Sequence, residues 1–367
     1  MSATRRRMEG VDMPDEHVAD RSLRIAMVAP PYFSIPPEAY GGIEAVVADL
    51  TRGLVSRGHR VTLIGHAADD MPGKVVRVFD EPQSHRLGEP GPEVMYAAAA
   101  ARIVDDLDVD VVHDHTLAGP LTALGRSVPT VATMHGPMDG ELGDYYRELG
   151  EAVSLVAISD AQRTDGPDLN WLATVPNGID VDNYPFRAAK EDYVLFLGRF
   201  VPEKGAHLAL DAARSANRRI VLAGKVNEAA EEEYFDEHIR PRLGDDAVYV
   251  GESDFDGKCE LYGEAACLLF PVQWPEPFGL VMIEAMACGT PVVALRSGSV
   301  SEVIDDGRTG VICDTPDELA AGIDRAVTLR PADCRDHVTR HYDVSVMVEG
   351  YERVYRVLVE DSGRDPW

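Results

Sequence analysis

The sequence predicts an α/β fold in which two Rossmann-like domains, each built on a doubly wound parallel sheet, face each other across a cleft. Short apolar runs rich in β-branched residues alternate with segments of helical periodicity, which is the pattern of parallel α/β folds. The apolar runs are almost continuous, as expected for strands buried on both faces. The alternation occurs twice along 367 residues, a length that suits about two domains.

The first alternating set opens with a strand at Leu23–Ala29, followed by a proline-rich loop at Pro30–Gly42. A helix is predicted over Ile43–Arg57, because apolar residues recur on one face and Gly58 ends the pattern. Further strands of this set are expected at Val61–Gly65, Val109–His113, Thr130–His135 and Leu155–Ser159.

The second set opens with a strand at Tyr193–Gly198. Further strands are expected at Ile220–Ala223, Ala247–Val250, Cys267–Phe270, Val292–Ala294 and Gly310–Cys313. Apolar residues at helical spacing predict a terminal helix over Val344–Asp361. Residues 177–192 are rich in turn-forming and charged residues and are predicted to link the two domains.

From these elements we expect a disordered tail over residues 1–22, an N-terminal domain over 23–185, a C-terminal domain over 186–342, and a final helical segment over 343–367 that returns to the N-terminal domain. The tail contains three arginines, Arg5–Arg7, but acidic and polar residues follow them instead of an apolar core. It therefore has the pattern of neither a signal peptide nor a membrane anchor. No apolar run reaches the roughly 20 residues that a membrane helix requires.

The composition excludes several classes of partner. A net charge of -28 argues against nucleic acid, whose affinity for proteins comes from phosphate contacts with Lys and Arg, and against broad docking on anionic lipid. The charge is also compatible with high solubility or with life at high salt. Five cysteines, an odd number without a C-x-x-C pair, indicate a reduced, cytoplasmic protein that uses cysteine as a small apolar residue.

Glu284 is the only residue between Leu280 and Cys288 that is not apolar. A helix that is apolar on all faces is normally buried, and a carboxylate in it is costly unless something donates a hydrogen bond to it. Neighbouring hydroxyls of a ribose or hexose would do so. A second glutamate, Glu276, lies at the start of the same stretch. The alternative for Glu284 is a structural carboxylate that caps or bridges local backbone.

A second group of residues in the same half is suited to phosphate. Arg199 and Lys204 follow the strand at Tyr193–Gly198, where a diphosphate would need cations, although both also fit as surface residues. The backbone N–H groups of Phe278, Gly279 and Leu280 open the helix that carries Glu284, and a helix start attracts anions. Together these features predict a nucleoside diphosphate pocket.

In the first half, Gly41 and Gly42 precede a helix, where paired glycines allow backbone to approach a phosphate or sugar closely; an ordinary tight turn is the alternative. His135 ends a strand and precedes Gly136-Pro137. It is suited to bind a sugar hydroxyl or to transfer protons near neutral pH, and a structural histidine explains it equally well.

Other chemistries find little support. His113 and His115 at positions i and i+2, without a third ligand at a clear spacing, are a poor zinc site, and no metal is expected. The G-x-G-x-x-G fingerprint, a Walker A loop, H-E-x-x-H and G-x-S-x-G are all missing from the sequence. Dehydrogenase, NTPase, metalloprotease and serine hydrolase functions are therefore disfavoured.

Taken together, the motifs resemble the family-4 retaining glycosyltransferases of the GT-B fold. The resemblance runs from about Leu23 to the terminal helix. The segments that carry it are Tyr40–Glu44, Thr133–Gly136, Val175–Asp180, Gly198–Gly205, Phe270–Glu284 and Ala287–Ala294.

The resemblance implies a role for each candidate residue. Glu284 would bind the ribose and Glu276 the donor sugar, while Arg199 and Lys204 would hold the departing diphosphate. The donor's phosphates and sugar would also meet the amides of Phe278, Gly279 and Leu280, the backbone at Gly41 and Gly42, and the side chain of His135.

The implied reaction is transfer of a sugar from a nucleotide sugar, with UDP preferred, to a soluble small-molecule or saccharide acceptor. It would proceed with retention and without a metal or other cofactor. A nucleotide-sugar epimerase, a glycoside phosphorylase and a non-catalytic nucleotide-sugar-binding subunit are the alternatives on the same fold. The sequence leaves the acceptor and the oligomeric state open.

Overall fold

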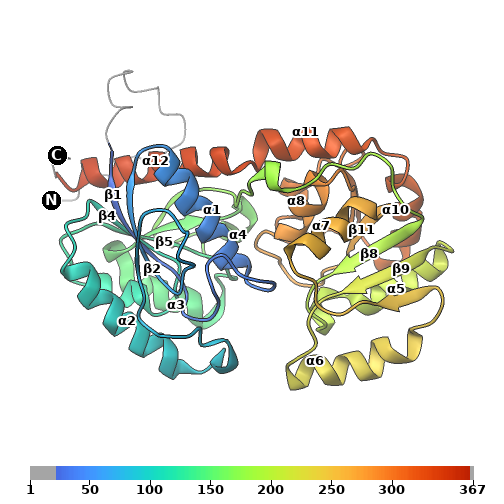
Figure 1. Cartoon of the computed structure of the whole chain (residues 1–367), viewed down its shortest axis with the longest axis horizontal. Helices are drawn as coiled ribbons and strands as arrows, with labels where there is room; N and C mark the ends of the chain where they lie inside the picture. Colours follow the sequence, from blue (N-terminus) through green and yellow to red (C-terminus); the bar gives the residue numbers. More distant parts are fainter. Residues whose placement is uncertain (1–21, 364–367) are drawn as a thin grey trace. The chain divides into compact units, whose positions relative to one another are not determined.

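The computed structural model describes residues 22–363, which form two compact units (Figure 1). Within the described residues, unit 1 comprises 22–37, Gly41–Pro176 and 347–363, and unit 2 comprises Glu38–Tyr40 and Asn177–Val346. Apart from Ser22, the predicted tail lies outside the described residues. The arrangement of two domains across a cleft stays a prediction, and each unit is described by itself.

Unit 1 contains a seven-stranded parallel sheet. Its strands are β1 Arg24–Val28, β2 Arg60–Ile64, β3 Lys74–Val76, β4 Val111–Asp114, β5 Thr130–Thr133, β6 Ser154–Ala157 and β7 Trp171–Thr174. They lie in the order β3-β2-β1-β4-β5-β6-β7. The four adjacent strands β1, β4, β5 and β6 are buried along nearly their whole length, as their apolar runs predict.

The helices of unit 1 connect these strands. They are α1 Gly42–Ser56, α2 Pro90–Asp105, α3 Gly140–Leu149, α4 Asp160–Thr164 and most of α12 Val344–Asp361. Short 3-10 helices also occur at η1 Ser84–Arg86, η2 Gly119–Ala123 and η3 Gly150–Ala152. Tyr351 and Tyr355 of α12 are fully buried, so the terminal helix belongs to the core of unit 1.

Unit 2 contains a six-stranded parallel sheet. Its strands are β8 Tyr193–Leu197, β9 Arg219–Ala223, β10 Ala247–Tyr249, β11 Cys267–Phe270, β12 Val292–Leu295 and β13 Gly310–Cys313, in the order β10-β9-β8-β11-β12-β13. Its helices are α5 Ala206–Ser215, α6 Ala229–Tyr234, α7 Phe255–Glu264, α8 Leu280–Ala287, α9 Val300–Val303, α10 Leu319–Ala326 and α11 Pro331–His341. Short helical turns are η4 Val181–Asn183, η5 Pro202–Lys204, the π-helix η6 Phe235–Ile239, η7 Arg240–Arg242 and η8 Pro316–Glu318.

Residues 177–192, predicted as the linker, are part of unit 2. Lys190 anchors them: its Nζ donates to the carbonyls of Gly263 and Cys288 at 2.8 and 3.1 Å and to Oγ1 of Thr290 at 2.7 Å. Burial lowers the pKa of Lys190 to about 8. The turn-rich composition of the segment therefore reflects a packed connection, which local sequence pattern cannot distinguish from a free linker.

Both sheets confirm the predicted fold class. When the strands of each unit are numbered from its own first strand, both sheets contain the order 3-2-1-4-5-6. The chain adds strands on one side of the first strand and then on the other, which defines the doubly wound Rossmann arrangement. The reversal lies between β1 and β4 in unit 1 and between β8 and β11 in unit 2. Ligands of such sheets bind outside the carboxyl ends of the strands at this switch point. The loops that follow these four strands are therefore expected to form the site.

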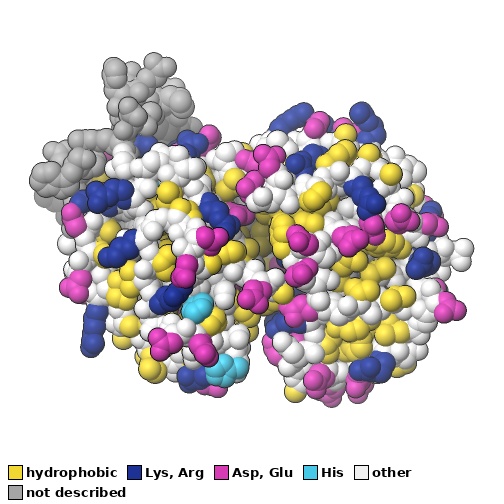
Figure 2. All heavy atoms as spheres, in the orientation of Figure 1, with side chains coloured by type: hydrophobic (Ala, Val, Ile, Leu, Met, Phe, Trp, Pro, Cys, Tyr) yellow, Lys and Arg dark blue, Asp and Glu magenta, His cyan; other side chains and the backbone are white. Residues whose placement is uncertain are grey.

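The surface carries the charge that the composition implies. Figure 2 shows acidic side chains spread over the visible face of both units, with basic side chains scattered among them. Within residues 22–363, no helix combines the length and apolar character needed to cross a membrane.

Candidate active site

In unit 2, the two loops at the switch point touch each other at a glycine. Gly205, in the loop after β8, has φ 74°, and a Cβ there would lie 2.2 Å from the carbonyl oxygen of Pro271, which follows β11. Only glycine permits this approach together with a left-handed backbone. The contact fixes the loop that carries Arg199 and Lys204 against the loop that carries Glu276.

Lys204 and Glu276 form an ion pair. Nζ of Lys204 lies 2.5 Å from Oε2 of Glu276 and 5.1 Å from the centre of the Trp274 ring. The side chains are 25% and 12% exposed, so both remain accessible from solvent. The structure thus brings together two of the residues predicted to meet the donor, and the ammonium keeps further N–H groups for a ligand.

Arg199 is held by two glutamates that sequence reasoning did not identify. Its Nε donates to Oε1 of Glu231 at 2.7 Å, and its Nη2 donates to Oε2 of Glu228 at 2.8 Å. Glu228 also accepts from Nζ of Lys225 at 3.1 Å, which adds a third cation to this region. The only signal in the sequence was an acidic run, which in so acidic a chain carries little information.

The start of α8 has a strained geometry that requires glycine. Gly279 is the N-cap residue with φ 80°, and a Cβ there would lie 2.9 Å from side-chain atoms of Met282 and Phe270. Phe278 beside it is buried, and its carbonyl oxygen accepts from Oγ of Ser299 at 2.8 Å. The backbone amides of Phe278, Gly279 and Leu280 are therefore fixed at the N-terminus of α8, as predicted for an anion-binding turn.

Glu284 is buried and has two partners from the protein. Oη of Tyr262 donates to Oε2 at 2.7 Å, and Oη of Tyr184 donates to Oε1 at 3.4 Å. Its exposed fraction is 7%. Neither the capping nor the backbone-bridging alternative describes this arrangement, because both donors are phenol groups. A carboxylate offers about four acceptor positions, so two bonds leave capacity for ribose hydroxyls.

In unit 1, Gly41 and Gly42 form the junction between the loop after β1 and α1. Gly41 is the N-cap with φ 147°, and a Cβ on it would lie 2.7 Å from Cβ of Pro37. Gly42 is the first residue of α1. Glu44 in the first turn is buried, and burial raises its pKa to about 7.

His135 lies two residues beyond β5 and is partly buried. Its Nε2 lies 2.9 Å from Nδ1 of His115, which follows β4. Burial lowers the pKa of His135 to about 4, so the ring is neutral at pH 7. Of the two roles left open by the sequence, hydrogen bonding to a ligand fits a neutral ring better than proton transfer near neutral pH.

The His113–His115 segment is engaged by the protein. His113 is buried between Oη of Tyr355 and Oγ1 of Thr133, each 2.7 Å from a ring nitrogen. Asp114 accepts from the amide and hydroxyl of Thr116. Within residues 22–363, no three side chains of His, Cys, Asp or Glu are grouped as metal ligands would be.

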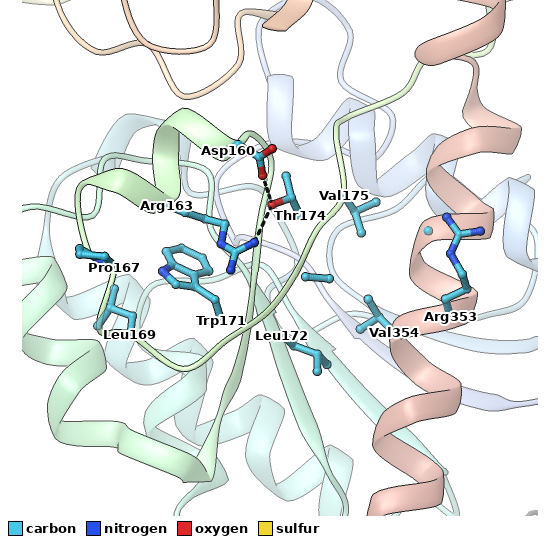
Figure 3. A pocket seen from close by; sticks show the side chains of 12 residues that line it. Asp160, Arg163, Pro167, Leu169, Trp171, Leu172, Thr174, Val175, Arg353 and Val354 are labelled. Carbon is cyan, nitrogen blue, oxygen red and sulfur yellow. Dashed lines mark hydrogen bonds between the residues drawn. The ribbon is translucent and has the colours of Figure 1, made fainter. Parts of the chain in front are cut away.

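Two cavities are lined by none of the predicted site residues. One of about 400 Å³ in unit 1 lies at the edge strand β7 and is bordered by Arg163, Trp171 and Arg353 (Figure 3). There Nη1 of Arg163 donates to Oγ1 of Thr174, which in turn donates to Asp160. The other, about 500 Å³ in unit 2, lies beside α7.

The comparisons with known proteins concern the family and the fold. The family model described as "Glycosyltransferase Family 4" matches residues 40–183, and that of "Glycosyl transferases group 1" matches residues 183–340. Among curated relatives, a phosphatidyl-myo-inositol mannosyltransferase of Mycobacterium leprae is 27% identical over 93% of this chain and 99% of its own. A glycogen synthase of Mycobacterium tuberculosis is 28% identical over 91% of this chain and 94% of its own.

Solved structures give the same result. AviGT4, a glycosyltransferase involved in avilamycin A biosynthesis, matches with a TM-score of 0.73 and 29% identity over 92% of this chain and 98% of its own. HepE from Anabaena, solved in complex with UDP and glucose, matches with a TM-score of 0.71 and 19% identity over 91% of this chain and all of its own, and shows the fold alone. The fold and the matches define a glycosyltransferase. The chain belongs to family 4 of the glycosyltransferases with the GT-B fold.

Proposed function

We propose that this glycosyltransferase moves a sugar from a nucleotide sugar, with UDP as the preferred nucleotide, to a small-molecule or saccharide acceptor, with retention at the anomeric carbon and without a metal ion. The observation that carries the proposal is the contact of Lys204 with Glu276 at the switch point of unit 2. A sugar diphosphate requires a cation and a hydroxyl-binding carboxylate side by side, and this pair supplies both.

Similar proteins support the donor and acceptor classes. HepE was solved with UDP and glucose and also with UDP-glucose, which favours UDP here. AviGT4 is involved in avilamycin A biosynthesis, and another relative is named a glycogen synthase, so we infer a small-molecule or saccharide acceptor here. The net charge of -28 favours such acceptors over an anionic lipid like the one in the mannosyltransferase's name.

Donor binding would exchange ion pairs. Lys204 and Arg199 are now neutralised by Glu276 and by Glu231 with Glu228. The diphosphate of a nucleotide sugar carries its two negative charges on adjacent phosphates and gains further charge as the sugar departs, so we expect both cations to turn toward it. Glu276 would then be released to accept from hydroxyls of the donor sugar, while Glu284 meets the ribose.

The chemical step would place its largest demand on the leaving diphosphate. The bond from the anomeric carbon to the diphosphate breaks, and a bond from the acceptor oxygen forms on the same face through an oxocarbenium-like transition state. The acceptor's proton passes to the departing phosphate oxygen, which balances the reaction without a protein nucleophile. Lys204, Arg199 and the N-terminus of α8 would stabilise the developing charge.

Release of nucleoside diphosphate from UDP-, GDP-, ADP- and TDP-sugars, measured without an acceptor and with EDTA present, tests the proposal. Slow release from a UDP-sugar that EDTA does not inhibit is the expected result. Release only with added Mn²⁺ or Mg²⁺ would contradict metal independence, and preference for another base would contradict UDP.

The same panel separates the rival functions. An epimerase would convert the donor sugar without releasing nucleotide, and a phosphorylase would require inorganic phosphate. A binding subunit would retain nucleotide affinity in calorimetry yet release nothing with any donor or acceptor. Once an acceptor is found, the anomeric configuration of the product, read by NMR, decides between retention and inversion.

A further inference from the structure

The backbone on both sides of His135 is fixed by one buried glutamine. Nε2 of Gln162, in α4, donates to the carbonyl oxygen of Met134 at 3.0 Å and to that of Gly136 at 2.7 Å. Oε1 of Gln162 accepts from the amide of Ile158 at 2.9 Å. With all its hydrogen-bonding groups engaged, Gln162 leaves the histidine little freedom except rotation of its ring.

The ring of His135 is oriented by His115. The backbone of His115 is itself fixed, because its amide donates to the carbonyl oxygen of Val28 in β1 at 2.9 Å. One face of its ring packs on His113, with 4.1 Å between ring centres. From this rigid position, Nδ1 of His115 meets Nε2 of His135 at 2.9 Å.

A bond between two neutral imidazoles needs one proton, and the surroundings indicate which ring supplies it. Each neutral ring has one N–H donor and one bare acceptor nitrogen. Nε2 of His115 is buried and has no hydrogen-bond partner within residues 22–363. A proton on that atom would be an unpaired buried N–H, which folded proteins avoid more strictly than an unpaired acceptor. The proton of His115 therefore belongs on Nδ1, which donates to His135.

The position of the proton on the neutral ring of His135 then follows. Its Nε2 accepts from His115, so in the neutral ring the hydrogen is on Nδ1. In the described part of the chain, Nδ1 of His135 has no hydrogen-bond partner, and it is not among the fully buried polar atoms. It is an accessible N–H group on a rigidly held ring.

We propose that His115 is a positioning residue that holds His135 in the tautomer protonated on Nδ1, so that His135 meets a ligand only as a hydrogen-bond donor. The inference deepens the proposed function and rests on it for the identity of the ligand. It defines the group that fits at this position: an oxygen with a free lone pair, such as a sugar hydroxyl or a carboxylate of the donor. An ammonium or amide N–H at the same place would be rejected.

The protonation state can be observed directly by NMR of the ring nitrogens in protein labelled with ¹⁵N-histidine, with His135 identified by its loss in His135→Gln. The wild-type protein at pH 7.5 should show a protonated Nδ1 and a bare Nε2 for His135. Free neutral histidine prefers the opposite tautomer. A wild-type His135 protonated on Nε2, or charged, would overturn the proposal before any variant is made.

Two variants of His115 test the positioning role. His115→Phe keeps an aromatic ring against His113 but removes the donor, so His135 should shift toward the Nε2–H form. His115→Asn can present an amide N–H near the position of Nδ1 and should restore the wild-type tautomer. An unchanged tautomer in His115→Phe would overturn the proposal; if that variant fails to fold, the wild-type spectrum and His115→Asn still decide.

Kinetics give the functional readout. Loss of one neutral hydrogen bond is worth on the order of tenfold in rate, so we expect about that loss of kcat for donor turnover in His115→Phe and near-complete recovery in His115→Asn. The dissociation constant of UDP should stay within about twofold, because nucleotide binding rests on unit 2. His85→Phe, at an exposed position, is the control for the same substitution. A wild-type enzyme inert toward all donors would refute the proposed function but leave the NMR result standing.

Discussion

At the scale of the residue, Glu284 is a buried carboxylate with two tyrosine partners and acceptor positions to spare. Its two tyrosine partners lower the cost of burying the carboxylate without filling its acceptor positions. We expect Glu284→Ala to weaken UDP binding by about 100-fold, since charged hydrogen bonds to two ribose hydroxyls are lost. Isothermal titration calorimetry measures this, with the exposed Glu360→Ala as control. Unchanged affinity would show that Glu284 is purely structural.

Lys204 should affect rate more than binding. The diphosphate gains charge as the sugar departs, so a cation near it stabilises the transition state more than the bound donor. Lys204→Ala should lower kcat by roughly 100-fold or more while the dissociation constant of UDP changes only a few-fold. Lys258→Ala, in the same unit, controls for loss of one positive charge. A variant with normal kcat and poor affinity would contradict this role.

Glu44 makes the stability of unit 1 depend on pH. Burial raises its pKa from 4.5 to about 7, so between these values the folded state holds a proton that the unfolded state has lost. The free energy of unfolding therefore falls as pH rises through this window, by on the order of 3 kcal/mol at about 1.4 kcal/mol per pKa unit. Glu44→Gln removes the effect.

The free energy of unfolding of Glu44→Gln, measured relative to that of the wild-type protein, should therefore increase from pH 5 to pH 8. Urea unfolding of both proteins at the two pH values measures it. The buried His113, whose pKa burial lowers to about 3, acts in the opposite direction below pH 6.5 in both proteins and cancels in the comparison. A difference independent of pH would mean that Glu44 is already ionised in the folded protein.

At the scale of elements, the loop after β12 supports the loop after β11 that carries Glu276. A Cβ on Gly298, whose φ is 50°, would lie 2.2 Å from the carbonyl oxygen of Glu276, and the amide of Ser299 donates to that oxygen at 3.0 Å. Because backbone blocks the added atom, Gly298→Ala must displace one loop. We expect a loss of stability of about 1–3 kcal/mol and at least a tenfold fall in kcat.

Thermal unfolding and donor-turnover assays check this prediction. Gly307→Ala is the matched control, because its φ is also positive at 80° but nothing lies within 4 Å of the added Cβ. It should lose stability from backbone strain and keep its activity. Equal losses of kcat in both variants would show that the loop after β12 does not act through Glu276.

The sequence allowed the central elements to be predicted, because continuous apolar runs mark strands buried on both faces, and glycines and cations after them mark the switch points. The strands β3 and β7 were not predicted: β3 has three residues, and β7 is an edge strand with every residue only partly buried. The partners of the site residues were also missed. Tyr184 lies 100 residues from Glu284 and Arg199 lies 32 from Glu231, and such pairings follow from packing, which no local pattern encodes.

At the scale of the whole molecule, the charge has two opposing effects on stability. The chain has 63 acidic and 35 basic residues, so many carboxylates cannot be paired. Most ion pairs of the described residues are exposed, as in Arg77 with Asp69 and Arg240 with Asp236, and such pairs contribute about 0–1 kcal/mol each. Salt weakens these pairs, but it also screens the repulsion among the excess carboxylates, which acts over the entire surface.

We expect the repulsion among the excess carboxylates to outweigh the attraction within ion pairs. The net charge is -28, while each exposed ion pair adds little to the free energy of unfolding. We therefore expect the midpoint of thermal unfolding to rise by several degrees between about 20 mM and 500 mM KCl, where the screening length falls below the spacing of surface charges. Potassium chloride is chosen because sulfate would also stabilise by exclusion from the surface. A midpoint that stays constant or falls with KCl would show that attractive pairs outweigh the excess charge, and that the acidic composition serves solubility alone.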